Sequence, residues 1–161
     1  MSVYVIADTH FGHENIIRFC NRPFCNVHQM NEEMIKRWNT VVKKTDTVIH
    51  CGDFGLGTKA ELAEICQKLQ GRKILIKGNH DCYKDEDYRK MGFAEVYKYP
   101  ILYKNWFLMS HEPLQLSETT PYFNFYGHVH NDEKYQDSRS TKCICVERTN
   151  YMPIKCLLLI I

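Results

Sequence analysis

Seven polar side chains of the types that bind metal ions occur at the ends of apolar segments of this chain. Two are aspartates, one is an asparagine, four are histidines, and none is a cysteine. Such a mixture of carboxylate, amide and imidazole donors suits Mn²⁺, Fe²⁺ or Zn²⁺ better than Mg²⁺ or Ca²⁺, which favour oxygen donors alone. Seven donors exceed what one ion needs, so the residue types predict a site for two divalent cations. The seven residues are Asp8, His10, Asp53, Asn79, His111, His128 and His130.

The segments around the first of these residues have the pattern of alternating strands and helices. Strands are expected at 3–7, 46–51 and 73–77, where short apolar runs end in polar turns. Amphipathic helices are expected over 30–42 and 58–69, because apolar residues recur there at spacings of three and four. This alternation predicts an α/β fold with a parallel sheet. Since the carboxyl ends of parallel strands meet at one edge, ligands that follow different strands can converge there.

After about residue 94 the sequence changes to short runs rich in β-forming residues. We expect these runs to be largely antiparallel strands of a second sheet, or of the far edge of the first. No linker or repeat separates the two halves, and the segment between Asp53 and Asn79 has room only for the helix and strand already assigned. A single domain over 1–161 without a cap domain is therefore expected. The runs are 94–97, 101–103, 106–109, 122–126, 142–146 and 154–161.

The composition is that of an ordinary globular chain. The 161 residues are 44% hydrophobic and 25% charged, and the net charge of +2 is too small to indicate nucleic-acid or membrane binding by itself. No basic segment precedes Asp8, so no signal peptide is expected. The longest apolar run, 156–161, is far shorter than the ~20 residues that cross a bilayer. We expect a cytoplasmic protein without a membrane partner, whose eight cysteines are reduced thiols.

Five short motifs, in a fixed order, carry a resemblance to a known family. In this order they resemble the five sequence blocks of the calcineurin-like metallophosphoesterases, and the longer run over 8–16 is similar to a small, cap-less prokaryotic and phage branch. The resemblance implies a four-layer αββα sandwich of two mixed β-sheets flanked by helices, with a dinuclear metal site at the strand ends. The motifs are Asp8-Thr9-His10, Gly52-Asp53, Gly78-Asn79-His80-Asp81, Ser110-His111 and Gly127-His128-Val129-His130.

The resemblance implies that the seven ligands are divided between two cations, with Asp53 as the bridge. A carboxylate between two dications offsets their mutual repulsion. The expected cofactors are thus two divalent metal ions, Mn²⁺ first, with Fe or Zn²⁺ as alternatives. One cation would be held by Asp8, His10 and His130, and the other by Asn79, His111 and His128.

The same resemblance implies a phosphoesterase that hydrolyses phosphodiesters or phosphomonoesters, with nucleotide-type substrates favoured. A metal-bridging hydroxide would attack phosphorus in line, and His80 would act as the general acid for the leaving group, with Asp81 orienting its ring. His13, Arg18 and Arg22 follow the first motif and are candidates for binding the substrate phosphate. A guanidinium group is suited to this because it binds phosphate oxygens bidentately.

Two other functions fit parts of the pattern. The first is a non-catalytic scaffold of the same fold, although such a scaffold need not keep His80 and all seven ligands. The second is a nucleic-acid-binding module, which would show tight, salt-sensitive binding without turnover. The run Gly52-Asp53-Phe54-Gly55 lacks the longer Asp-Arg-Gly block of the serine/threonine phosphatases, which argues against phosphoprotein substrates. The expected partner is a phosphoester, such as a nucleotide or a nucleic-acid end.

Overall fold

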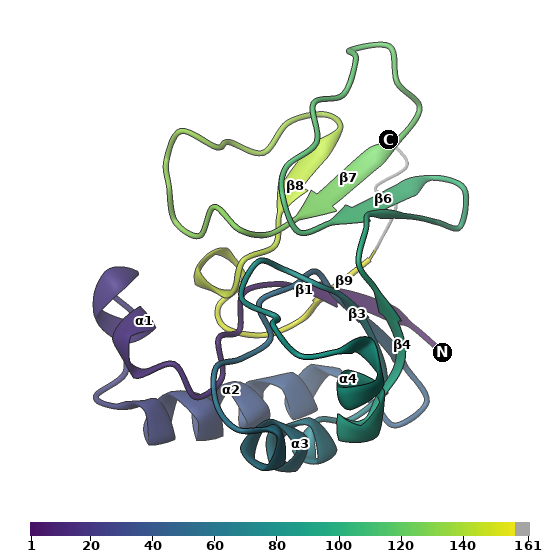
Figure 1. The fold of residues 1–161 in the computed structure, drawn as a ribbon. Helices are drawn as coiled ribbons and strands as arrows, with labels where there is room; N and C mark the ends of the chain where they lie inside the picture. Colours follow the sequence, from purple (N-terminus) through teal and green to yellow (C-terminus); the bar gives the residue numbers. More distant parts are fainter. Residues whose placement is uncertain (157–161) are drawn as a thin grey trace.

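The chain forms two β-sheets, with helices along the outer side of the first (Figure 1). The structure is a computed structural model that describes residues 1–156. The helices are α1 (Glu14–Phe19), α2 (Val27–Val41), α3 (Lys59–Lys68) and α4 (Asp85–Met91), with a 3₁₀ turn at Val146–Arg148. The strands are β1 (Val3–Ile6), β2 (Thr47–His50), β3 (Arg72–Ile76), β4 (Phe93–Tyr97), β5 (Ile101–Tyr103), β6 (Phe107–Ser110), β7 (Phe123–Tyr126), β8 (Thr141–Cys143) and β9 (Ile154–Lys155).

The first sheet contains the predicted parallel strands. Its order is β4-β3-β2-β1-β9, with β1 to β4 parallel and β9 antiparallel to β1. The register pairs Ile6 with His50 and His50 with Leu75, so β1, β2 and β3 end close together at one edge. Of the run predicted at 154–161, β9 covers the first two residues, and 157–161 lie outside the described residues.

The second sheet shows that the prediction of largely antiparallel strands was wrong. Its order is β5-β6-β7-β8, and only β5 and β6 pair antiparallel, whereas β6, β7 and β8 are parallel. The connections 111–122 and 127–140 explain the difference, because a parallel pair needs a crossover of about a dozen residues and a hairpin does not. The first connection begins at the predicted ligand His111, and the second carries the predicted ligands His128 and His130 near its start.

The two faces of the first sheet are buried in two different cores. Ile6, Val48 and Leu75 pack with α2, α3 and α4 in one core. Val5 and Ile49 point the other way and pack between the two sheets with residues of β6 and β7. The α/β class with two mixed sheets and helices is therefore confirmed. Within residues 1–156 the four α-helices all precede β4, and the chain after β4 contains the 3₁₀ turn Val146–Arg148 as its helical element.

The two long helices confirm the predicted apolar spacing. In α2 the buried residues are Met30, Met34 and Trp38, which lie on one face. At the start of α3, Thr58 and Glu61 form a capping box, which satisfies backbone N–H groups that the first turn leaves free. The short helices α1 and α4 were not predicted. None of the helices in residues 1–156 is long and apolar enough to cross a membrane.

The two sheets are joined at the edge where the predicted ligands lie. Ala7 forms an isolated parallel bridge with Cys145, and its N–H donates to the Ile144 carbonyl oxygen at 3.0 Å. The Ile144 N–H in turn donates to the Tyr126 carbonyl oxygen at 2.8 Å. The carboxyl ends of β1 and β7 therefore lie side by side, which brings ligands from both sheets into one place.

Candidate active site

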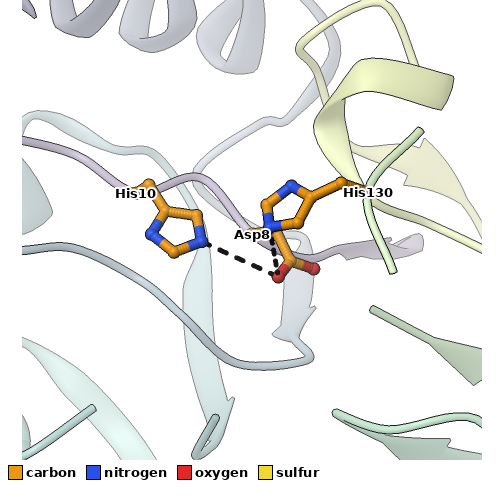
Figure 2. Close-up of side chains that lie close together, drawn as sticks. All are labelled: Asp8, His10 and His130. Carbon is orange, nitrogen blue, oxygen red and sulfur yellow. Dashed lines mark ion pairs between the residues drawn. The ribbon is translucent and has the colours of Figure 1, made fainter. Parts of the chain in front are cut away.

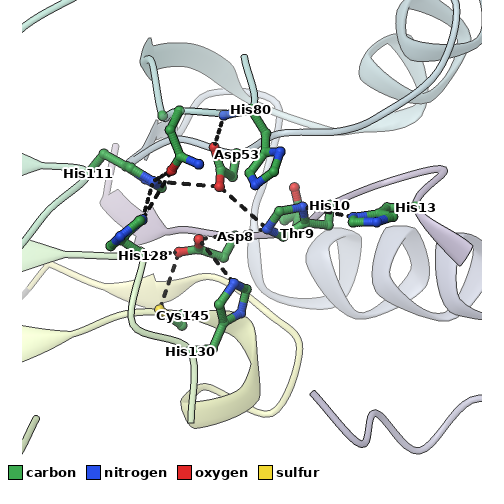
Figure 3. A network of polar contacts seen from close by, with 12 residues as sticks. Asp8, Thr9, His10, His13, Asp53, His80, His111, His128, His130 and Cys145 are labelled. Atoms are coloured by element: carbon green, nitrogen blue, oxygen red, sulfur yellow. Dashed lines mark hydrogen bonds and ion pairs between the residues drawn. The ribbon is translucent and has the colours of Figure 1, made fainter. Parts of the chain in front are cut away.

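Side chains from the ends of five strands converge in one polar cluster (Figure 3). All seven predicted ligands belong to it, although the first and last are far apart in the sequence. The convergence follows from the topology, because β1, β2 and β3 of one sheet and β6 and β7 of the other all end at this edge. The ligands follow β1 (Asp8, His10), β2 (Asp53), β3 (Asn79), β6 (His111) and β7 (His128, His130).

Asp53 lies between two groups of ligands. Its Oδ2 is 3.5 Å from Nε2 of His10 and 3.5 Å from Nε2 of His111. Its other oxygen, Oδ1, accepts a hydrogen bond from the His80 backbone N–H at 2.8 Å. The carboxylate is thus fixed on one side and faces a histidine from each group on the other, which is what a bridging ligand requires.

The first group consists of Asp8, His10 and His130 (Figure 2). Asp8 Oδ1 is 3.9 Å from Nε2 of His10 and 3.8 Å from Nε2 of His130. The other Asp8 oxygen, Oδ2, accepts hydrogen bonds from the His128 N–H at 2.8 Å and from the Cys145 thiol at 3.2 Å. Three donor atoms therefore surround one small volume, while the back of the carboxylate is held in place.

The second group consists of Asn79, His111 and His128. Nδ1 of His111 donates to the Cys51 carbonyl oxygen at 2.9 Å, so in the neutral ring, the form that binds metals, Nε2 carries the lone pair. That Nε2 lies 2.9 Å from Asn79 Oδ1 and 3.2 Å from Nδ1 of His128. A lone pair of His111 therefore faces an oxygen of Asn79, an arrangement that a cation placed among these atoms would stabilise.

Unpartnered buried atoms show that this donor set fits metal ions. Asp8 Oδ1 and His10 Nε2 are both buried, and neither has a hydrogen-bond partner within the described residues. Leaving such atoms unsatisfied is costly unless an ion binds to them. Burial raises the pKa of Asp8, and burial together with the charge of His130 lowers the pKa of His10. His10 is thereby held neutral, which is the form of histidine that binds metals.

The backbone around the ligands is strained. Five of the ligands have positive φ angles, a region that residues other than glycine seldom adopt. Such strain is found at sites where the surrounding structure fixes the backbone for a function. The five are Asp8 (59°), His10 (49°), Asp53 (55°), His128 (70°) and His130 (48°).

Glycines next to the ligands allow this close packing. A Cβ on Gly127 would lie 2.3 Å from Asp8 Oδ2, and one on Gly78 would lie 2.2 Å from Asp53 Oδ1. Gly52 has a φ of 91°, and its Cβ would lie 2.5 Å from Nδ1 of His111. A side chain at any of these three positions would clash with a predicted ligand, which explains why a glycine precedes Asp53, Asn79 and His128.

Comparison with known proteins agrees with this geometry. A sequence model of the calcineurin-like phosphoesterase family matches residues 1–153. The chain belongs to this family. An uncharacterized protein of Methanocaldococcus jannaschii is 33% identical over 162 residues, which cover 94% of this chain and 85% of that protein. The Gene 66 protein of Mycobacterium phage L5 is 34% identical over 83 residues, covering 50% of this chain and 40% of the phage protein.

Two solved structures share the fold. The crystal structure of a protein of unknown function from Aquifex aeolicus has a TM-score of 0.74 and 32% identity, covering 96% of this chain and 95% of that chain. The crystal structure of a nuclease from Pseudomonas putida has a TM-score of 0.55 and 22% identity, covering 80% of this chain and 61% of that chain. At that identity the second likeness concerns the fold alone.

Within this phosphoesterase fold, His80 lies at the exposed rim of the cluster (Figure 3). Its ring centroid is 5.4 Å from that of His10 and 6.4 Å from that of His13. The bond from its backbone N–H to Asp53 fixes its position relative to the candidate bridge. The ring therefore faces the ligand cluster without belonging to either group of ligands.

Asp81 does not lie where the sequence analysis expected it. Its Oδ2 accepts hydrogen bonds from the Asp53 N–H at 2.7 Å and the Gly78 N–H at 2.9 Å, and its Oδ1 accepts one from the Phe54 N–H at 3.0 Å. The carboxylate is buried, and no contact with the His80 ring occurs within the described residues. Asp81 therefore holds the loops after β2 and β3 together instead of orienting the ring.

Arg22, expected to bind substrate, is instead part of the support of the site. The Arg22 guanidinium is buried, donates to the carbonyl oxygens of Asp8 and Thr9, and pairs with Glu147 at 2.7 Å. It therefore supports the loop after β1 and is not free to bind substrate. Arg18 is exposed on α1 and lies 5.9 Å from the centroid of the Phe19 ring.

His13, a candidate for binding substrate, lies next to the cluster. Its Nδ1 is 3.4 Å from Nδ1 of His10, and its ring centroid is 6.4 Å from that of Phe19. Phe19 is itself 67% exposed. His13 and α1 therefore form a rim on the His10 side of the site.

Glu147 is a component of the site that the sequence analysis missed. Its Oε1 lies 3.0 Å from Nδ1 of His130, whose Nε2 faces Asp8. Burial would lower the pKa of His130, but hydrogen bonds to Cys20 and Glu147 and the charge of Asp8 raise it to about 10. A carboxylate behind a ligating histidine fixes its ring and its tautomer. Glu147 belongs to none of the five motifs. Its place beside His130 depends on the tertiary structure, so no local pattern in the sequence predicts it.

Proposed function

We propose that this protein is a metal-dependent phosphodiesterase that acts on nucleotide-type esters, with His80 as the general acid. The observation that carries the proposal is the juxtaposition of two ligand groups around Asp53 with an imidazole at their rim. The mixed oxygen and nitrogen donors suit Mn²⁺ first, with Fe or Zn²⁺ as alternatives.

The seven ligands would be divided between two cations according to the two groups in which they lie. Asp8, His10 and His130 would hold one cation, Asn79, His111 and His128 the other, and Asp53 both. When bound, a pair of divalent cations lowers the pKa of water toward neutrality and neutralises charge on phosphoryl oxygens.

The chain's own contribution is to hold these ligands and to supply a proton. Hydrogen bonds to the back of Asp8 and Asp53 leave one oxygen of each directed into the site. A ring nitrogen of His80 would donate its proton to the leaving oxygen as the ester bond breaks. Buried Glu147 and Arg22 keep His130 in place during this step.

Diesters are favoured over monoesters because Arg22, the buried guanidinium beside the site, is not free to meet a second negative charge on the substrate. The Arg22 guanidinium is already paired with Glu147, so it cannot bind the second negative charge of a monoester. Arg18 is exposed at the rim and would contact the part of a substrate that extends beyond the cluster. A diester carries one charge at phosphorus and groups on both sides of it, which suits such an open site.

The proposal predicts a specific loss on replacing His80. With Mn²⁺ supplied, His80→Ala should lower kcat on diesters with alkyl leaving groups at least about 100-fold, because such leaving groups need a proton. The variant should keep both metal equivalents, measured by inductively coupled plasma mass spectrometry. Asp53→Asn should instead reduce metal content together with activity.

The matched control is His28→Ala, which removes a histidine that is 80% exposed on α2. It should leave rate and metal content unchanged. Wild-type rates for His80→Ala on an alkyl diester would refute the general-acid role. A fully metallated wild type that binds oligonucleotides without cleaving any mono-, di- or cyclic ester would favour a binding module.

A further inference from the structure

A pocket of about 470 Å³ opens directly beside the candidate active site. Asn79 and His111, two ligands of the second group, form part of its wall. Its volume falls in the range of roughly 300–1,000 Å³ that is usual for small-molecule sites. The pocket therefore extends the metal cluster into a space of nucleoside size on the His111 side.

The outer wall of this pocket is formed by groups with no role in the metal cluster. Tyr99 is 70% exposed, and Nζ of Lys98 lies 5.5 Å from the centroid of its ring. Lys77 also lines the pocket, but its ammonium donates to the Tyr83 carbonyl oxygen at 2.7 Å and contacts Asp85 at 3.3 Å. Within residues 1–156, Lys98 has no ion-pair partner, so its charge is free to meet a ligand.

An acidic residue limits which ligands the pocket can take. Glu112 is exposed in the wall, and its backbone carbonyl oxygen accepts a hydrogen bond from the Ser110 hydroxyl. Its carboxylate disfavours a purely anionic ligand but accepts hydrogen bonds from the N–H groups of a nucleobase. The Tyr99 ring offers a face for stacking a base, and the Lys98 ammonium offers N–H donors for the oxygens of a base or a ribose.

The end of the ligand cluster opposite the pocket is bordered by His13 and His80. His13 and His111 lie at opposite ends of the ligand cluster (Figure 3). The His80 ring lies near His10 and His13, not in the wall of the pocket. A diester at the cluster would therefore direct its leaving group toward α1 and its other ester group toward Tyr99.

We propose that the Lys98–Tyr99 pocket binds the nucleoside that keeps the phosphate during hydrolysis. The proposal rests on the proposed function and makes its substrate class a nucleoside phosphodiester. Water oxygen bonds to phosphorus, the bond from phosphorus to the leaving oxygen breaks, and His80 gives that oxygen a proton. The proton lost by the water returns to His80 through solvent. The product in the pocket is a nucleoside monophosphate.

Two aryl esters that differ only in the retained group test this assignment. One is thymidine 5′-(p-nitrophenyl phosphate), which leaves the nucleoside in the pocket, and the other is methyl p-nitrophenyl phosphate, which leaves a methyl group. Tyr99→Ala should lower kcat/KM for the thymidine ester about tenfold or more, given the usual strength of base stacking. Lys98→Ala should lower it by a similar factor, because a hydrogen bond from a charged donor to the nucleoside is lost. Both variants should cleave the methyl ester within about twofold of the wild type. Tyr99→Phe should behave like the wild type, because it keeps the ring.

The controls remove an aromatic ring and a lysine elsewhere. Trp106→Ala removes a ring that is 50% exposed in the β5–β6 turn, at the far end of β6 from His111, and Lys36→Ala removes an exposed lysine of α2. Neither should change either rate. The inhibition constant of thymidine 5′-monophosphate should rise in Tyr99→Ala by the same factor as kcat/KM falls.

The experiment distinguishes a failure of the pocket assignment from a failure of the proposed function. Equal effects of Tyr99→Ala on both esters, or none on either, would overturn the pocket assignment while the proposed function stands. If the fully metallated wild type cleaves neither ester, the proposed function fails. In that case calorimetry with thymidine 5′-monophosphate still tests the pocket. Weaker binding to Tyr99→Ala than to the wild type would support the assignment, and equal binding would overturn it.

Discussion

Single residues of the ligand cluster are held in conformations that cost free energy. A positive φ outside glycine costs on the order of 1–3 kcal/mol, and Asp8, Asp53 and His130 are among those that adopt it. The conformations persist because each residue is fixed by contacts behind it. Asp8 Oδ2 is held by the His128 N–H, and Asp53 Oδ1 by the His80 N–H. The cluster is thus preorganised by its backbone, which suits ligands that must keep their geometry.

Gly127→Ala tests how closely Asp8 must be packed. The new Cβ would lie 2.3 Å from Asp8 Oδ2 and 2.6 Å from the Ala7 Cβ, so the Asp8 carboxylate must move. We expect a loss of stability of about 1–3 kcal/mol and the loss of one metal equivalent. Urea unfolding and metal analysis measure the two effects. In the control Gly57→Ala the nearest atom is the flexible end of Glu61 at 3.1 Å, and full metal content is expected.

Glu147→Gln tests the carboxylate behind His130. The change keeps an acceptor for the His130 ring and for Arg22 but removes the charge that both contact. Changes to such partners usually cost 10–100-fold in metal affinity, and we expect a loss of about that size here. Competition with a chromophoric chelator measures it. Glu33→Gln on α2, where Glu33 pairs with Arg37 at 2.8 Å, should leave the affinity unchanged, and an equal loss there would contradict the assigned role.

At the scale of elements, Asp81 connects the loops that follow β2 and β3. Asp81→Asn would place an amide N–H₂ against backbone N–H donors of Gly78 and Asp53, or of Phe54. A buried donor left unsatisfied costs about 1–3 kcal/mol, and we expect destabilisation of that size in urea unfolding. The ratio of rates on alkyl and p-nitrophenyl diesters should not change, because Asp81 does not contact the His80 ring.

That ratio separates the two roles considered for Asp81. If Asp81 acted through His80, the alkyl ester would slow selectively and stability would be unaffected. Glu86→Gln, an exposed acidic residue of α4, is the matched control and should change stability by less than about 0.5 kcal/mol.

The sequence specified elements well where burial imposes a pattern. Apolar runs located β1, β2 and β3, and the apolar face of α2 was visible as Met30, Met34 and Trp38. The helices α1 and α4 were missed because they span about two turns or fewer and each buries at most two residues. Strand direction in the second sheet was also missed, since alternation along a strand does not depend on the direction of its neighbour.

The same limit applies to the site. The seven ligands were recognisable because each follows an apolar strand in a short motif. Arg22 and Glu147 contact each other across 125 positions of the chain, and nothing near either residue predicts the contact. Asp81 was assigned by its neighbour in sequence, His80, although its side chain turns to the backbone of the β2 loop. Local motifs therefore predicted which residues gather in the candidate metal centre, whereas the groups that support them became visible only in the fold.

At the scale of the whole molecule, the candidate metal centre lies where the two sheets meet. Asp8, Asp53 and Asn79 come from the first sheet, and His111, His128 and His130 from the second. Cations bound there would connect both sheets, in addition to contacts such as the core between them and the contact of Ala7 with residues 144 and 145. Since the unfolded chain lacks this cluster, metal binding should stabilise the folded state.

Metal removal should therefore lower the melting temperature. At 100 times the dissociation constant a single bound ion contributes about 2.7 kcal/mol, and 1 kcal/mol corresponds to about 2–4 °C in a chain of this length. We expect Mn²⁺ to raise Tm by about 5–10 °C over the same protein in EDTA, measured by differential scanning calorimetry. The shift should persist in His28→Ala and shrink in Asp53→Asn, because only the latter loses a ligand. Equal Tm values with and without Mn²⁺ in the wild type would mean that the seven side chains do not form a metal site.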